Sequence, residues 1–198
     1  MTVKSSKPMT NSSAEVRGFT LIELMVTLGV SAIVLSLGVP GFQGLVRDNR
    51  MTTQYNYFVT ILNIARSESI KRGIKVTVCK RSSAGNNCDN NTNWENGWIV
   101  FTDPDDNGTV DSGETIIRVQ EALTGNNTFR ASPTRHRITY DNQGFAIGFN
   151  DTFVLCDDRG AYHAKAIVID NGRIRRAIDS DNDGIVENGT GNVSCPKI

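Results

Sequence analysis

The sequence has few of the residues that enzyme active sites use. It contains only two histidines, His136 and His163, and no G-x-S-x-G or similar nucleophile motif. Carboxylates are plentiful, but spacing alone cannot select a catalytic pair among them. A C-x-x-C pair, the usual sign of a structural zinc site, is also absent. We therefore expect no enzymatic activity and no cofactor, with calcium at an acidic turn as the one exception.

An excess of charge of either sign is also missing. The 21 Lys and Arg residues balance 21 Asp and Glu residues, and the formal net charge is zero. A polyanionic partner such as nucleic acid would therefore need a local basic patch. With 38% hydrophobic and 21% charged residues, the composition is that of an ordinary globular protein. The length of 198 residues suits one globular domain with an appendage.

Charged residues are missing from a long apolar run at positions 24–46. About 20 apolar helical residues are enough to cross a bilayer, and the basic residues Lys4, Lys7 and Arg17 ahead of the run predict a cytoplasmic N-terminus. A cleaved secretory signal is one alternative, but the run is too long and lacks the usual cleavage site. A plain single-span anchor is another. Neither explains Glu23, because a lone carboxylate in hydrocarbon costs about 2.5 kcal/mol or more.

The residues around Glu23 resemble a known processing site. The stretch GFTLIE, residues 18–23, is similar to the cleavage site of type IV prepilins and type II secretion pseudopilins. The resemblance implies a leader peptide of residues 1–18, cut by a prepilin peptidase between Gly18 and Phe19, and methylation of Phe19. Residues 19–46 would then remain as a transmembrane and filament-core helix. In the filament, Glu23 would pair with the N-terminal amine of a neighbouring subunit.

Helical periodicity continues beyond the apolar run as far as residue 72. Tyr55, Phe58, Leu62 and Ala65 recur at spacings of three and four, and Gly73 is a natural stop. From residue 74 onward, short β-branched and aromatic segments alternate with Gly, Asn and Asp. We expect strands at 74–80, 97–102, 114–119, 137–141, 144–149, 152–156, 164–170 and 172–178. The predicted fold class is α+β, with a head domain of residues 47–198 in which an antiparallel sheet packs on the helix.

Four cysteines lie in the head, and an exported chain meets an oxidising compartment that favours disulfides. Four cysteines allow three pairings. We expect Cys79 to pair with Cys88, which would staple the end of a strand to a Gly/Asn-rich loop. We expect Cys156 to pair with Cys195, which would tie the C-terminus back to the sheet.

The segment WENGWIVFTDPDDNGTVDSGETIIR, residues 94–118, resembles a hairpin of the GspH/FimT group of minor pilins and pseudopilins. VTVCKRSSAGNNC before it and GRIRRA near the end fit the same group. The resemblance implies a type IV pilin-like fold, anchored in the inner membrane with a periplasmic head that becomes extracellular on an assembled pilus. Its partners would be major and minor pilins and the inner-membrane assembly platform. The resemblance does not by itself separate a type IV pilus from a secretion pseudopilus.

An acidic turn inside this hairpin has the spacing of a calcium loop. Positions 1, 3, 5, 9 and 12 of an EF-hand-type loop are matched, and Gly108 is at position 6. The five matching residues are Asp103, Asp105, Asn107, Asp111 and Glu114. The flanks, however, read as strands, and Asp/Asn/Gly turns carry such residues without any metal. A second acidic turn, Asp179, Asp181 and Asp183, has Thr190 at position 12, which cannot supply a bidentate carboxylate.

Positive side chains cluster in two segments of the head. The segment 128–137 carries three arginines without an acid, and 159–176 carries five basic residues against Asp170 alone. The basic residues are Arg130, Arg135 and Arg137 in the first segment and Arg159, Lys165, Arg173, Arg175 and Arg176 in the second. In a strand, Arg173 and Arg175 would share one face about 6.6 Å apart and could grip successive phosphates. Gly172 ahead of them would allow a close approach of a backbone.

The sequence G-R-x-R at 172–175 resembles the element by which some FimT-type minor pilins bind DNA during natural transformation. The resemblance implies DNA binding through Gly172, Arg173, Arg175 and Arg176; Lys165 and the arginines of residues 128–137 would extend the patch. Two alternatives remain open: a basic edge strand that blocks aggregation, or arginines paired with Asp179 and Asp181. We interpret the chain as a minor type IV pilin that acts in pilus assembly or in the tip complex, with DNA capture for natural transformation as a further task of its head. The alternative is a type II secretion pseudopilin with protein partners only.

Overall fold

The computed structural model describes residues 18–90 and 93–196. The chain divides into two compact units, with the boundary between Gly44 and Leu45. One helix, α1 (Leu21–Arg72), contributes to both units. Apart from Gly18, the expected leader peptide of residues 1–18 lies outside the described residues.

Local sequence signals explain both ends of α1. Thr20 caps the start, because its Oγ1 accepts a hydrogen bond from the backbone N–H of Glu23 at 3.2 Å. At the other end the backbone N–H of Gly73 donates to the carbonyl of Ser69 at 3.0 Å, with φ at +67°. Glycine adopts this left-handed conformation at low cost and is common just after a helix. The expected stop at Gly73 is confirmed.

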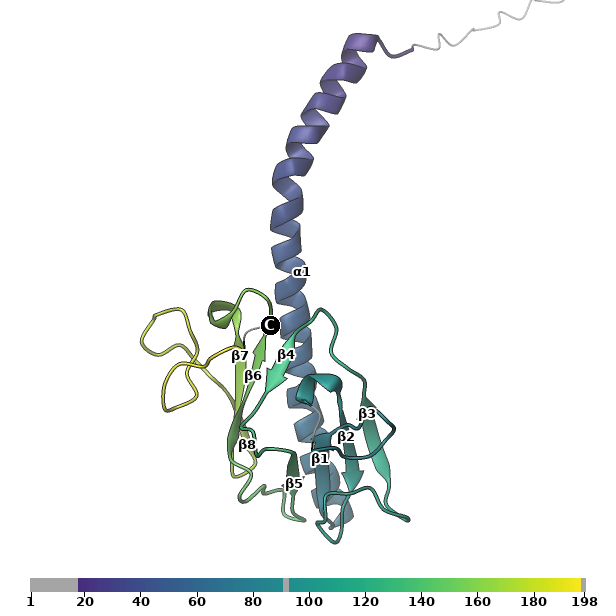
Figure 1. The fold of residues 1–198 in the computed structure, drawn as a ribbon, viewed down its shortest axis with the longest axis vertical. Coiled ribbons are helices and arrows are strands. Elements are labelled where there is room, and N and C mark those ends of the chain that lie inside the picture. Colours follow the sequence, from purple (N-terminus) through teal and green to yellow (C-terminus); the bar gives the residue numbers. More distant parts are fainter. Residues whose placement is uncertain (1–17, 91–92, 197–198) are drawn as a thin grey trace, which may run out of the picture. The chain divides into compact units, whose positions relative to one another are not determined.

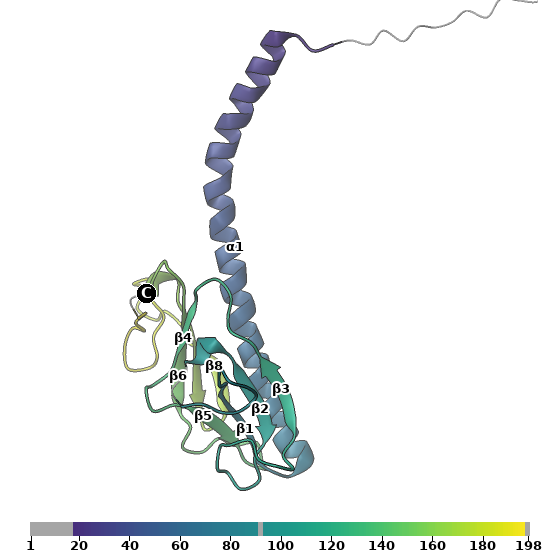
Figure 2. The same ribbon diagram turned by 45° about the vertical axis from the view of Figure 1, so that its right-hand side comes forward.

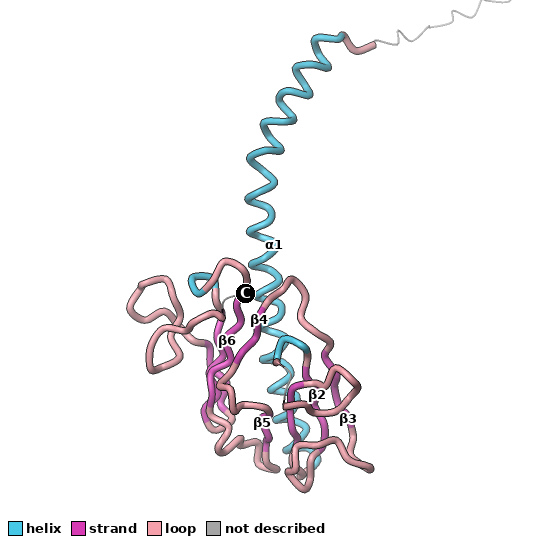
Figure 3. Tube along the Cα trace, viewed as in Figure 1, coloured by secondary structure: helices cyan, strands magenta, loops and turns pink. Residues whose placement is uncertain are grey.

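The head contains two four-stranded antiparallel sheets (Figure 1). The first has the order β3-β2-β1-β5 and consists of β1 (Val76–Lys80), β2 (Trp98–Thr102), β3 (Ile116–Gln120) and β5 (Arg137–Tyr140). The second has the order β4-β6-β7-β8 and consists of β4 (Thr128–Arg130), β6 (Asp151–Cys156), β7 (Lys165–Asp170) and β8 (Arg173–Arg176). Two 3-10 turns, Trp94–Asn96 and Ala161–His163, are the only other helical pieces in the described part (Figure 3).

Both sheets pack on the second half of α1, and the main core lies between them. Figures 1 and 2 show the two sheets beside the same stretch of this helix. The buried residues of α1 are the apolar Met51, Phe58, Ile61, Leu62 and Ala65 and the polar Ser69. They match the predicted face in Phe58, Leu62 and Ala65, while Tyr55 is half-buried at its margin. The α+β class predicted from the sequence is confirmed.

The outer face of each sheet is covered by a segment that ends in a disulfide. On the first sheet, Cys79, Ile99 and Phe101 are buried beneath Cys88 and Val110. On the second, Ala166 and Val168 are buried beneath Val193 and the residues around it. The disulfides are Cys79–Cys88 and Cys156–Cys195, the two pairings expected among the three that four cysteines allow.

One strand prediction was wrong, and one strand was missed. No strand forms at 144–149, because Gly144 and Gly148 both have φ near +81° and close turns instead. Conversely, β4 forms in a segment that the sequence presented only as a basic stretch. Its three residues are too few for a propensity signal, and they become a strand by pairing with β6, where Phe129 lies opposite Leu155.

Candidate functional site

The first unit of the chain presents an exposed apolar helix surface. All residues from 18 to 39 are exposed, and Phe19 retains 80% of its accessible surface. By length and composition, α1 is apolar enough to cross a membrane. Large side chains such as Leu21, Ile33 and Leu37 are not covered by other described residues, so another hydrophobic environment must cover them. Together with the prepilin motif, this helix indicates membrane anchoring.

Glu23 lies in the first turn of this helix and is exposed. Thr20 and Glu23 have the spacing of a capping box, and the N-terminal end of a helix favours a carboxylate. Part of the reason for a Glu at this position is therefore local. Its side chain has no ionic partner among the described residues, so its charge remains available for one outside the chain.

The β7–β8 hairpin holds the second candidate site, and the sequence explains its geometry. Asn171 and Gly172 connect the strands with φ of +49° and +86°, the left-handed conformations that a two-residue Asn-Gly turn needs. In the resulting register Arg173 lies opposite Asp170 and Arg175 lies opposite Val168. Arg173 and Arg175 therefore share the outer face of the sheet. The expected strand at 172–178 is confirmed over 173–176.

The three arginines of β8 are exposed, and none forms an ion pair with another described residue. The alternative pairing with Asp179 and Asp181 is therefore absent. Arg176 lies opposite Ile167, which places it on the other face from Arg173 and Arg175. Since β8 ends the strand order of its sheet, its position also fits the alternative of an edge strand protected by charge.

Gly172 has a role within the fold. It is buried, and a side chain there would meet the backbone of residues 144–146, with the nitrogen of Ala146 at 2.9 Å. The backbone that approaches Gly172 is therefore that of its own chain. Gly172 shapes the hairpin and does not offer a contact surface, unlike the two arginines that follow it.

The arginines of 128–137 are engaged in ion pairs, unlike those of β8. Arg130 contacts Glu95. Arg135 pairs with Asp151 at 3.2 Å and lies over the Phe149 ring, 5.4 Å from its centroid. Arg137 pairs with Asp106 at 3.5 Å and donates to its carbonyl at 3.0 Å. These partners come from distant parts of the sequence, which is why the segment looked unpaired.

The basic residues of the second segment, 159–176, also have different surroundings in the fold. Arg159 pairs with Asp157 and Asp48, each at 2.7 Å. Burial raises the pKa of Asp157, but the hydrogen bonds from Arg159 outweigh it, and the net effect is a lowered pKa. Lys165 is half-buried and lies on the face opposite to that of Arg175, since it pairs with Leu155. Among the described residues of the two basic segments, Arg173 and Arg175 thus carry the positive charge on the outer face that is free of ion pairs.

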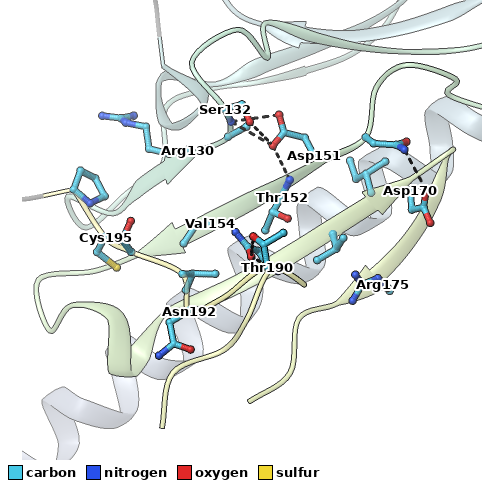
Figure 4. A pocket seen from close by; sticks show the side chains of 18 residues that line it. Arg130, Ser132, Asp151, Thr152, Val154, Asp170, Arg175, Thr190, Asn192 and Cys195 are labelled. Carbon is cyan, nitrogen blue, oxygen red and sulfur yellow. Dashed lines mark hydrogen bonds between the residues drawn. The ribbon is translucent and has the colours of Figure 1, made fainter. Parts of the chain in front are cut away.

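A groove of about 700 Å³ lies on this outer face, between the second sheet and the C-terminal segment. Its walls include Arg130 from β4, Val154 from β6 and Arg175 from β8. Figure 4 shows Arg130 and Arg175 on opposite sides of it, with Thr190 and Asn192 of the C-terminal segment between. The fold therefore brings the two basic segments to one groove. The sequence contained no signal for the wall formed by Thr190 and Asn192, because that wall exists only once the C-terminus is tied back.

The acidic turn is the third candidate site. One oxygen from each of the Asp103, Asp105 and Glu114 carboxylates lies within 4.8 Å of the others. Asn107 connects Asp105 to Asp111, donating from Nδ2 at 2.8 and 2.6 Å. Burial raises the pKa of Asp103, and burial together with the neighbouring acids raises that of Glu114. All five expected residues are thus in one loop between β2 and β3.

The second acidic turn also gathers its carboxylates. Oxygens of Asp179, Asp181 and Asp183 lie within 4.8 Å of one another. Asp181 and Asp183 are exposed, and Asp179 is only partly buried. Asp179 Oδ1 is buried without a hydrogen-bond partner among the described residues, but no residue of this cluster is fully buried as Asp103 is. Thr190 remains the residue at its position 12.

Comparisons with known proteins agree with these features. Residues 54–172 match the family described as type II transport protein GspH, and residues 15–39 match the prokaryotic N-terminal methylation motif. Prepilin peptidase-dependent protein D of Escherichia coli K12 is 46% identical over 43 residues, which is 22% of this chain and 30% of that protein. The matched segment thus spans less than a third of that relative's length.

A solved structure shares the fold. The crystal structure of the type IV minor pilin FimU from Pseudomonas aeruginosa gives a TM-score of 0.53, covering 77% of this chain and 99% of that chain. The sequence identity is 16%, so this similarity shows the architecture alone.

Proposed function

Since the chain belongs to the GspH family of type IV pilin-like minor pilins and pseudopilins, we propose that it is a minor subunit of a type IV pilus. The observation that carries the proposal is the wholly exposed apolar helix surface at the N-terminus, with one carboxylate near its start. Such a surface requires lipid before assembly and neighbouring helices after it. The subunit has a structural role and no catalytic one.

The N-terminal residues have separate tasks in this proposal. Prepilin peptidase removes the leader between Gly18 and Phe19 on the cytoplasmic side, and Phe19 becomes the methylated N-terminus. The inner membrane holds residues 19–46 and the head of residues 47–198 lies in the periplasm. On the assembly platform, Glu23 pairs with the terminal amine of a neighbouring major or minor pilin. The pair neutralises two charges that would each be costly in an apolar filament core.

Substitution of Glu23 tests this role. We expect Glu23→Ala to reduce the amount of protein in sheared pili at least about tenfold, while its amount in membranes is unchanged. The reason is that an unpaired amine in the filament core costs about 2.5 kcal/mol, and about 1.4 kcal/mol corresponds to a factor of ten. Immunoblots of the two fractions provide the measurement.

Thr20→Ala is the matched control, because it removes the helix cap and keeps the carboxylate. Equal loss in both variants would mean that Glu23 serves the local helix end only.

Deletion of the gene separates the two systems: loss of pili with intact protein secretion supports a pilus subunit. Loss of secretion with normal pili would instead identify a type II secretion pseudopilin.

DNA capture is a second candidate function of the same subunit. The specific observation is the pair Arg173 and Arg175, exposed on one face of an edge strand and free of ion pairs among the described residues. About 6.6 Å separates such positions in a strand, which matches the spacing of successive phosphates along a nucleic acid strand. Contacts of this kind position DNA without reading its sequence.

The DNA proposal is tested with the full chain in non-ionic detergent and a fluorescent DNA duplex of mixed sequence. We expect Arg173→Ala/Arg175→Ala to weaken binding at low salt about tenfold or more, because two phosphate contacts are lost. Fluorescence anisotropy measures the affinity, and circular dichroism confirms that the variant is folded.

Arg118→Ala is the matched control. Arg118 is also an exposed arginine on an edge strand, β3 of the first sheet. If both variants lose a similar amount of DNA affinity, any exposed arginine contributes through its charge alone and β8 is not a specific binding element. If the double variant still binds DNA but aggregates, the arginines of β8 protect the sheet edge and DNA capture is rejected.

A further inference from the structure

The acidic loop between β2 and β3 contains a buried carboxylate with an unused oxygen. Asp103 has no exposed surface. Its Oδ2 accepts hydrogen bonds from Thr77 Oγ1 at 2.6 Å and from the backbone N–H of Gly108 at 3.2 Å. Its Oδ1 is buried and has no hydrogen-bond partner among the described residues. A buried charged oxygen without a partner is costly, so a ligand at this point would remove a penalty.

The neighbouring carboxylates are close enough to share one cation with Asp103. Oxygens of Asp103, Asp105 and Glu114 all lie within 4.8 Å of one another. Calcium binds oxygens at 2.3–2.6 Å, so two oxygens on one ion are separated by at most about 5 Å. Asp111 is linked to the same group, because the Asn107 amide donates to both Asp105 and Asp111. One ion can therefore reach oxygens of Asp103, Asp105 and Glu114, and Asp111 would join them by a movement of its side chain.

The ion pairs of the described loop go to Asp106, and Arg137 acts on Asp103 only through its charge, without a contact. Asp106 has two cationic partners, Lys75 at 3.0 Å and Arg137 at 3.5 Å. None of the four acids of the cluster has an ion pair with a described residue. Because like charges this close repel, the loop is stabilised by any cation that neutralises several carboxylates together.

We propose that this loop is a calcium site, independent of pilus assembly and of DNA binding, with Asp103, Asp105, Asp111 and Glu114 as its ligands. Asn107 joins them when its amide turns to present Oδ1. Calcium is favoured over magnesium because the irregular loop offers several carboxylates, whereas magnesium requires near-ideal octahedral geometry and retains its waters. Strands replace the helices that flank an EF-hand, and Asp103 connects the site to the sheet through Thr77.

The site would stabilise the cover of the first sheet. Val110 lies inside the loop and packs on the cluster that contains Cys79 and Cys88. Its backbone N–H also donates to Asn87 Oδ1 at 3.1 Å, within the disulfide loop. Ion binding therefore fixes the acidic loop and the disulfide loop together. The expected result is a higher free energy of unfolding.

The test uses the full chain in non-ionic detergent with calcium chloride as the probe. We expect one calcium per chain by titration calorimetry, with a dissociation constant of about 10⁻⁴–10⁻³ M, as in extracellular calcium modules. Calcium should also raise the melting temperature. The near-ultraviolet circular dichroism signal of the buried Trp94 and Trp98 monitors the transition. Glu114→Gln should weaken binding at least about tenfold and remove the thermal shift, because it loses the bidentate carboxylate.

Asp181→Asn is the matched control, since it removes one carboxylate from the other, exposed acidic cluster. It should leave calcium binding unchanged, while Asp105→Asn, at an exposed ligand, should weaken it as Glu114→Gln does. The proposal is overturned by the absence of heat and thermal shift at about 10 mM calcium, well above the weakest such modules. It is also overturned if magnesium acts equally, or if Asp181→Asn abolishes binding and Glu114→Gln does not.

Discussion

At the scale of single residues, Phe58 lies at the centre of the aromatic cluster that joins the two sheets to the helix. Its ring lies 4.7–5.8 Å, centroid to centroid, from those of Trp94, Trp98, Phe129 and Phe153. Trp98 belongs to the first sheet, while Phe129 and Phe153 belong to the second. One side chain of α1 therefore makes contact with both sheets and with the 3-10 turn that precedes β2.

We expect Phe58→Ala to lower the free energy of unfolding by about 3–5 kcal/mol, because it leaves a cavity among rings that cannot collapse into it. Urea unfolding of the full chain in detergent, followed by tryptophan fluorescence, measures this loss. Asn56→Ala, at an exposed position of the same helix, should change stability by no more than about 0.5 kcal/mol. A loss of less than about 1 kcal/mol for Phe58→Ala would contradict the assignment of this ring to the centre of the core.

Arginines illustrate how far residue type alone can be interpreted. Arg135 and Arg175 both come from segments with almost no acids, and the sequence assigns them the same role. In the fold, Arg135 holds the loop at Gly148 and Asn150 by hydrogen bonds to their carbonyls. Arg175 remains exposed on the sheet. Substitutions in the first segment would therefore report on stability, whereas those in β8 would test the proposed DNA binding.

At the scale of elements, the two disulfides have parallel tasks. Each holds a segment without regular structure over the outer face of one sheet, and each buries apolar residues there. The Cys79–Cys88 loop separates its cysteines by 9 residues, whereas Cys156–Cys195 separates them by 39. Closing the longer loop removes more entropy from the unfolded chain, so the second disulfide should contribute more to the free energy of unfolding.

We expect Cys156→Ala/Cys195→Ala to lower the free energy of unfolding by about 4 kcal/mol, compared with about 3 kcal/mol for Cys79→Ala/Cys88→Ala, from the chain-entropy relation. Urea unfolding measures both. Removal of the second disulfide should also release the C-terminal segment, which would uncover Ala166 and Val168. A released terminal segment is cleaved faster by proteases. Equal protease resistance with and without this disulfide would show that packing alone holds the segment.

At the scale of the whole molecule, zero net charge sets the form of any binding to DNA. Without long-range attraction, affinity must come from the few contacts made by β8. With two phosphates contacted, the slope of log affinity against log salt should be about −2. A slope several times steeper in the anisotropy experiment would mean that arginines now paired within the fold are released on binding.

The sequence by itself determined the features that depend on neighbouring residues. The processing motif, the helix from its Thr20 cap to the Gly73 stop and the Asn-Gly hairpin each follow from a few adjacent residues, because capping and turn conformation are local effects. Seven of the eight strands were found in the same way. The calcium-type spacing was equally visible, since all its residues belong to one loop.

Only the tertiary structure decided which charges remain free and what each acid touches. Glu95, Asp106 and Asp151 reach Arg130, Arg137 and Arg135 across strands that are remote in the chain. The buried, unpaired oxygen of Asp103 likewise exists only once β1 and β2 lie side by side. Burial and ion pairing are properties of packed surfaces, and the sequence around each residue does not contain the partners that packing will supply.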